Sequence, residues 1–323
     1  TPERFHALNE ETAERWPRTM LATSTHDTKR SEDVRARISL LSEIPDRWAA
    51  AVRRWRDMNE THRRNRMPDR NAEYLLYQTL VGAWPLETER AVAYMEKASK
   101  EAKAFTSWTD PDPEYDQALA GFVAAILSDV PFRQEVESFA EPLKESGWVS
   151  SLAQQLLKLT CPGVPDIYQG TELWDLSLVD PDNRRPVDYS ARRALLGELP
   201  GLSPEEIWRS AATGLPKLHV TQRALHLRRE RPHAFGPVGD YVPLYASGAR
   251  RDHVIAFSRG GEVITVVPRF VLKLGGDWAD TQVMLPEGEW HNVLTGESVT
   301  SHPLPMGSLL GRFPVALLAT SAS

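Results

Sequence analysis

The sequence predicts a mixed α/β region followed by an all-β domain: the closing part of a (β/α)8 barrel with a large helical insertion, then a small antiparallel β-sandwich. Three observations lead to this prediction. Two short apolar runs, each followed by polar residues, are typical of strands. The long stretch between them repeats apolar residues at three- and four-residue steps, as helices do. After about residue 235 the pattern changes to that of strands.

The first two strands are predicted at residues 18–25 and 164–168. Each precedes a polar cluster, at His26–Arg30 and at Gln169–Arg185. In a (β/α)8 barrel the loops after the strands build the active site, and eight strands are needed to close it. We therefore expect the remaining strands to lie outside this chain. The absence of an initiator Met before Thr1 agrees with a chain that opens in mid-protein.

The segment from about 29 to 160 is predicted to be almost entirely helical. Aromatic residues such as Trp48, Trp55 and Phe132 recur at helical spacing, which favours a core position over a ligand site. A further helix is predicted from about 216 to 230. The strands of the β domain are predicted at Asp240–Tyr245, His253–Ser258, Val263–Val267, Thr281–Leu285 and Val315–Thr320.

Composition excludes several classes of function. The 323 residues carry a net charge of −6, which gives no electrostatic basis for binding nucleic acid or an anionic membrane. No apolar run approaches the roughly 20 residues that span a bilayer. The single cysteine, Cys161, cannot form an internal disulfide, so we expect a reducing, cytoplasmic setting and a buried structural role for its thiol.

The segment TSTHDTKRSED, residues 23–33, is the first candidate site. A carboxylate here can bind neutral hydroxyl groups while neighbouring cations orient it. The alternative is that Asp27 or Thr28 caps the following helix. The candidate residues are His26, Asp27, Lys29 and Arg30.

The second candidate site is the loop of residues 173–189. One hypothesis is that its charged residues line a substrate pocket; the other is that an Arg–Asp network stiffens the loop. For Glu172, just before it, we expect a hydrogen bond to the backbone. The residues concerned are Asp180, Asp182, Asn183, Arg184 and Arg185.

No metal or cofactor is expected. The nine histidines lack metal-ligand spacing, and the aspartate-rich turns lack the spacing and glycine of a calcium loop. Trp278 and Trp290 leave open a sugar-binding role for the β domain, because flat aromatic faces suit sugar rings.

Four segments resemble the maltooligosyltrehalose synthase family of the α-amylase superfamily. The combination of HDTKRSED and DPDNRRPVD is the specific part of the resemblance, whereas His-Asp after a strand is common to the superfamily. The resemblance covers most of this chain and only the carboxyl-terminal part of the family's length. The segments are TSTHDTKRSEDVRARI from residue 23, LVGAWP at 80–85, KASKEAKAFTSW at 97–108 and PGVPDIYQGTELWDLSLVDPDNRRPVDY at 162–189.

The resemblance implies an enzyme that converts the reducing-end α-1,4 linkage of a maltooligosaccharide into an α,α-1,1 linkage by intramolecular transglucosylation. Retaining chemistry of this kind needs a carboxylate nucleophile and a second carboxyl group as acid and base. Asp27 matches the superfamily's third carboxylate, which stabilises the transition state. The resemblance also implies substrate contacts for His26, Lys29, Arg30, Asp182, Asn183 and Arg184. For Lys29 and Arg30 the alternative is that they support Asp27.

The nucleophile and the acid/base have no counterpart in this sequence. We therefore expect the chain to be inactive alone and to need the missing amino-terminal part of the same enzyme as its partner. Two alternatives remain open: another hydrolase or transferase of the α-amylase superfamily, and a non-catalytic maltooligosaccharide-binding module. The expected domains are 1–28 (barrel strand and catalytic loop), 29–150 (helical insertion), 151–232 (last barrel strand and closing helices) and 233–323 (β domain).

Overall fold

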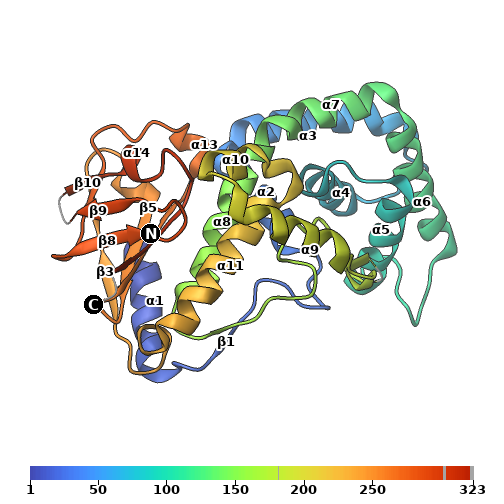
Figure 1. Ribbon diagram of the computed structural model, residues 1–323. Helices are drawn as coiled ribbons and strands as arrows, with labels where there is room; N and C mark the ends of the chain where they lie inside the picture. The colour runs from blue at the N-terminus through green and yellow to red at the C-terminus, as the bar shows by residue number, and fades with distance from the viewer. Residues whose placement is uncertain (181, 301–302, 321–323) are drawn as a thin grey trace. The chain divides into compact units, whose positions relative to one another are not determined.

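The computed structural model describes residues 1–180, 182–300 and 303–320 (Figure 1). The chain divides into two compact units. Unit 1 comprises Thr1–Thr25, Trp148–Asp175 and the described residues from Pro186 on, and unit 2 comprises His26–Gly147 and Leu176–Arg185. Each unit is described by itself below.

Unit 2 is helical, as the apolar spacing predicts. Its core is aromatic: the Trp55 ring is fully buried and packs edge-on against Tyr77, Phe132 and Phe139, with ring centroids 5.5–5.9 Å apart. Such edge-to-face pairs bury large apolar areas in a specific geometry. The core positions predicted for Trp48, Trp55 and Phe132 are confirmed. The helices are α2 (Glu32–Ser39), α3 (Pro45–Asn59), α4 (Arg70–Ala83), α5 (Thr88–Ala102), α6 (Pro113–Ser128) and α7 (Val130–Ala140), followed by the start of α8 (Lys144–Thr160).

Helices α2 and α4 approach each other closely because α4 carries a glycine at the contact. A Cβ placed on Gly82 would lie 2.7 Å from Cγ1 of Ile38 and 2.8 Å from Cγ1 of Val34. These separations are shorter than any normal van der Waals contact, so the close approach depends on the missing side chain.

The two predicted strands before the polar clusters exist, but each is only two residues long. They are β1 (Met20–Leu21) and β2 (Val164–Pro165), and they pair in parallel with Met20 opposite Val164. The Val164 amide donates to the Thr19 carbonyl and the Asp166 amide donates to the Leu21 carbonyl, both at 2.8 Å. The predicted strands were longer because the apolar runs continue beyond the paired residues.

The carboxyl-terminal part of unit 1 holds two antiparallel sheets. The six-stranded sheet has the order β3-β5-β6-β11-β8-β9, and the three-stranded sheet has the order β10-β7-β4. All five predicted strands are confirmed, and the structure adds four further strands of two to four residues, which the sequence analysis did not predict. The strands are β3 (Tyr241–Leu244), β4 (Ala246–Ser247), β5 (Val254–Arg259), β6 (Val263–Pro268), β7 (Gln282–Met284), β8 (Glu289–Asn292), β9 (Ser298–Thr300), β10 (Pro303–Pro305) and β11 (Ala316–Thr320).

Strand β5 is buried on both faces. Because successive side chains point to opposite faces, Ile255 and Phe257 enter one apolar cluster while Val254 and Ala256 enter another. The first cluster also holds residues of α8 and α11, and the second holds residues of the three-stranded sheet. The six-stranded sheet, which contains β5, is therefore the middle layer of unit 1.

The remaining helices of unit 1 include the predicted helix at 216–230, which forms as α11. No helix among the described residues is long and apolar enough to cross a membrane. The helices are α1 (Pro2–Arg15), α9 (Tyr189–Glu198), α10 (Pro204–Arg209), α11 (Leu215–Glu230), α12 (Pro232–Phe235), α13 (Val271–Leu274) and α14 (Met306–Leu309).

Candidate functional site

The two polar loops singled out in the sequence pair with each other inside unit 2. The Ser31 amide donates to the Ser177 carbonyl at 3.0 Å, and the Val179 amide donates to the Lys29 carbonyl at 3.1 Å. Arg30 and Leu178 form the antiparallel bridge between these two bonds. The first candidate site and residues 176–185 of the second are thus parts of one structure.

Asp27 and His26 lie in a turn with their side chains open to solvent. The Asp27 side chain is 78% exposed, the His26 side chain is 60% exposed, and His26 Nε2 lies 3.2 Å from Asp27 Oδ2. Helix α2 begins only at Glu32, with Ser31 at its N-cap position. The alternative that Asp27 or Thr28 caps this helix is therefore wrong, since the helix starts several residues later than the sequence pattern suggested.

Asp182 of the second loop accepts several hydrogen bonds within the protein. Its carboxylate accepts two hydrogen bonds from Arg90 of α5, at 3.0 and 2.8 Å, and one from the Leu178 amide at 2.8 Å. Burial by itself raises the pKa of this carboxyl, but the bonds from Arg90 and Leu178 and the charges of Arg90 and Arg185 outweigh it, so the pKa lies below its usual value. Asp182 is therefore held ionised within a protein network, as the loop-stiffening hypothesis expects.

Asn183 connects this network to the first loop. Its Nδ2 donates to the His26 carbonyl at 2.8 Å. Its neighbour Arg184 is exposed and pairs with Asp180, with Nε 3.2 Å from Oδ1. Residue 181, between them in the loop, lies outside the described residues.

Arg30 directs its guanidinium into the helices of unit 2. Its Nη2 donates to the Leu75 carbonyl at 3.1 Å and to Thr79 Oγ1 at 2.9 Å, both on α4. Its Nε donates to the Tyr94 hydroxyl of α5 at 3.2 Å. The sequence suggested either substrate contact or support of Asp27 for Arg30, and the donors named here bind protein groups.

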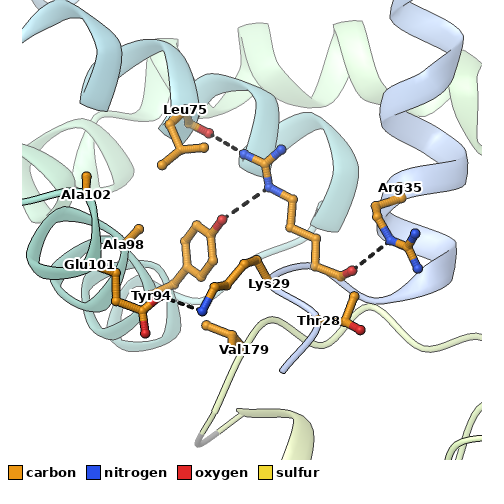
Figure 2. A pocket seen from close by; sticks show the side chains of 10 residues that line it. Thr28, Lys29, Arg35, Leu75, Tyr94, Ala98, Glu101, Ala102 and Val179 are labelled. Atoms are coloured by element: carbon orange, nitrogen blue, oxygen red, sulfur yellow. Dashed lines mark hydrogen bonds and ion pairs between the residues drawn. The ribbon is translucent and has the colours of Figure 1, made fainter. Parts of the chain in front are cut away.

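Lys29 and Arg30 border a cavity of about 490 Å³ (Figure 2). Lys29 forms an ion pair with Glu101 of α5 at 2.5 Å. Lys97, one turn before Glu101, lies 3.9 Å from that carboxylate and 3.8 Å from Asp180. A chain of alternating charges thus runs from the first loop across α5 to the second loop.

Sequence reasoning missed the residues of α5 that hold these loops. Arg90 and Glu101 contact residues 92 and 72 positions away along the chain, and such contacts leave no local pattern. Only the four-residue spacing of Lys97 and Glu101, typical of ion pairs on one helix face, could have drawn attention to this surface.

The structure also places three residues about which the sequence made predictions: Glu172, Cys161 and Trp290. Glu172 pairs with the Arg192 side chain, not with the backbone, because Arg192 reaches it from α9 while also donating to the Gly170 carbonyl. Cys161 is buried, and burial raises the pKa of its thiol to about 12, which suits the structural role. Trp290 is only 2% exposed, so its ring offers no platform to a sugar.

The described residues contain no group of three or more His, Cys, Asp or Glu side chains that could hold a metal ion. The candidate site is therefore built from a carboxylate, an imidazole and a set of cations held in ion pairs. Such groups can bind hydroxyl-rich ligands and stabilise positive charge that develops on them.

Comparisons with known proteins agree with the sequence motifs. No model of a known protein family matches the chain. Two curated proteins from strains of Mycobacterium tuberculosis, each named "Putative maltooligosyl trehalose synthase", are 39% identical over 97% of this chain. The chain spans 39% of their length.

Solved structures give the same result. Maltooligosyltrehalose synthase from Arthrobacter ramosus is 40% identical and superposes with a TM-score of 0.88 over 99% of this chain and 41% of that one. A Sulfolobus tokodaii protein described as a hypothetical maltooligosyl trehalose synthase is 32% identical, with a TM-score of 0.77 over 99% of this chain and 41% of that one. The resemblance is thus confirmed: in sequence and fold, this chain corresponds to about two fifths of a maltooligosyltrehalose synthase.

Proposed function

We propose that this chain is the carboxyl-terminal part of a maltooligosyltrehalose synthase, an enzyme that converts the reducing-end α-1,4 linkage of a maltooligosaccharide into an α,α-1,1 linkage. The observation that carries the proposal is Asp27, whose side chain is 78% exposed and lies beside the His26 imidazole. Asp27 is the third carboxylate of the site, and a maltooligosaccharide is its ligand.

In this role Asp27 accepts hydrogen bonds from ring hydroxyl groups and stabilises the oxocarbenium-like transition state. His26 binds the same ring. Lys29, Arg184 and Arg185 are exposed cations of the two loops, with side chains 57%, 52% and 59% exposed. Arg30 and Asp182 bind the protein and support the site from behind.

The nucleophile and the acid/base come from the amino-terminal part of the same enzyme, because Asp27 alone cannot supply the carboxyl pair that the chemistry requires. Strands β1 and β2 are two neighbouring strands of the (β/α)8 barrel, α2 to α7 form its helical insertion, and the two antiparallel sheets form the β-sandwich. The enzyme acts in the cytoplasm, which fits a single buried cysteine.

The alternative of a non-catalytic binding module loses one of its two aromatic residues, because Trp290 is buried, whereas Trp278 is partly exposed. Another activity of the α-amylase superfamily is distinguished by its products. Hydrolysis raises reducing power, whereas the proposed reaction removes it without shortening the oligosaccharide.

The test uses maltopentaose with the full-length enzyme and with this chain alone. We expect the full-length enzyme to convert maltopentaose into a non-reducing product of the same mass, and this chain alone to leave it unchanged. Release of free reducing sugar as the main product of the full-length enzyme would contradict the synthase assignment. Turnover by the isolated chain would contradict the division of the catalytic groups.

A further inference from the structure

The loop of residues 176–180 and 182–185, here called the positioning loop, is fastened to α5 by a partly buried ion pair between Arg90 and Asp182. Arg90 binds both carboxylate oxygens of Asp182, and its Nη2 also donates to the Leu176 carbonyl at 3.1 Å. The Asp182 side chain is only 12% exposed. A two-pronged bond of this kind fixes both the distance and the orientation of the loop relative to the helix.

From Asp182 the chain runs directly into Asn183, which reaches the first loop. Asn183 Nδ2 donates to the carbonyl oxygen of His26 at 2.8 Å. That carbonyl belongs to the peptide unit that joins His26 to Asp27. Because a peptide unit is planar, fixing its oxygen also fixes the direction in which the chain enters Asp27.

Apolar packing contributes little to fixing the position of this peptide. The His26 and Asp27 side chains are mostly exposed, so apolar burial contributes little to their position. The main-chain hydrogen bonds that join the described residues of the two loops lie at Lys29 and Ser31. The hydrogen bond from Asn183 thus acts on a peptide whose neighbouring side chains are mostly exposed.

We propose that Asn183 is a positioning residue for Asp27, and that Arg90 and Asp182 hold Asn183 in place. The proposal rests on the proposed function, because it gives Asp27 a reaction to serve. Asn183 uses its amide on the protein and acts through the His26 carbonyl rather than by touching the sugar. Displacement of a catalytic group by about 1 Å can lower a rate roughly 100-fold.

The experiment measures kcat and KM for maltopentaose in the full-length enzyme. Asn183→Ala removes the bond to His26, and we expect kcat to fall roughly 10- to 100-fold while KM stays within about twofold. Asn9→Ala is the matched control, since Asn9 Nδ2 makes the same kind of bond, 2.9 Å to the Phe5 carbonyl in α1. Thermal unfolding of both variants shows whether they fold.

A second pair of variants tests the support of Asn183. Arg90→Lys keeps the charge but loses the two-pronged bond to Asp182, and we expect the same selective fall in kcat. Arg312→Lys is its control, because Arg312 binds both carboxylate oxygens of Glu205 in unit 1. We expect this control to retain the kcat of the unmodified enzyme.

Asp27→Asn, measured beside these variants, separates the two proposals. If Asp27→Asn abolishes turnover while folded Asn183→Ala and Arg90→Lys match their controls, the positioning role is wrong and the function stands. If Asp27→Asn keeps full activity, both proposals fail. A fall in kcat for Asn183→Ala that is matched by an equal rise in KM would assign Asn183 to substrate binding and overturn its positioning role.

Discussion

The Arg30 guanidinium and the Tyr94 hydroxyl lie 3.2 Å apart, and this contact ties the candidate catalytic loop to helix α5. Tyr94 is 5% exposed, and the same guanidinium also binds the Leu75 carbonyl and Thr79 of α4. Arg30 therefore joins one loop to two helices without using a carboxylate.

We expect Arg30→Met to lower the free energy of unfolding by about 1–3 kcal/mol, because it leaves buried acceptors without their donor. Tyr94→Phe is expected to cost about 1 kcal/mol. In the Arg30→Met background the Tyr94 change should cost measurably less, since the bond between them is already lost. Urea unfolding of the four proteins measures this coupling, and fully additive losses would contradict it. Arg53→Met, at an exposed position of α3, serves as the control.

Asp27→Asn in the full-length enzyme is expected to lower kcat/KM roughly 100- to 1,000-fold, because it removes a negative charge that stabilises the transition state while keeping the side chain's size. The assay is the loss of reducing power from maltopentaose. Asp57→Asn, at an exposed position of α3, should leave the rate unchanged. Equal rates for the two variants would remove Asp27 from the reaction.

His219 of α11 makes the stability of the chain depend on pH. Burial lowers the pKa of its imidazole to about 4, although Nε2 lies 3.0 Å from the Leu294 carbonyl, a bond that opposes the shift. The unfolded chain binds a proton near pH 6.5 and the folded chain only near pH 4, so this stabilisation is complete above pH 6.5 and is lost as the pH falls to 4. The loss amounts to about 3 kcal/mol.

His219→Gln is expected to flatten this pH dependence, because glutamine keeps a donor for the Leu294 carbonyl and does not titrate. His226→Gln, at an exposed position of the same helix, should retain it. Chemical unfolding at pH 5 and pH 8 provides the measurement. A slope that is unchanged in His219→Gln would assign the acid sensitivity to other groups.

Two glycine substitutions are expected to have opposite signs. Gly82→Ala should destabilise the chain by about 1–3 kcal/mol, because its Cβ meets Ile38 and Val34 where α2 and α4 touch. Gly121→Ala in α6 should stabilise it by up to about 1 kcal/mol, because nothing lies within 4 Å of its Cβ and alanine favours a helix. Thermal unfolding of the two variants provides the measurement, and a melting temperature of Gly82→Ala that is unchanged or raised would contradict the close packing of α2 and α4.

The helices and the principal strands could be predicted because their apolar periods are local. The helical stripe containing Trp55 and the short, mostly apolar run of β5 each express, within a few residues, which positions are buried. The two-residue strands β1 and β2 were overestimated because an apolar run does not show where hydrogen bonding stops.

The candidate site was only partly predictable, because its contacts are not local in the sequence. Its residue types were visible in the two loops, but the pairing of Ser31 with Ser177 uses main-chain groups that every sequence carries. The roles of Arg30 and Asp182 depend on partners from α4 and α5. Their residue types alone therefore left two alternatives open for each: substrate contact, or a contact within the protein.

The bond from Asn183 to His26 spans 157 positions of the chain. During synthesis on the ribosome, His26 emerges long before its partner exists, and all of α2 to α8 must be made in between. Contacts between such distant positions close slowly, because the entropy of the intervening chain must be lost first. The turn that carries Asp27 is therefore among the last parts of this region to acquire its final geometry. A chain released before residue 183 would contain the helices but would lack the hydrogen bond that fixes this turn.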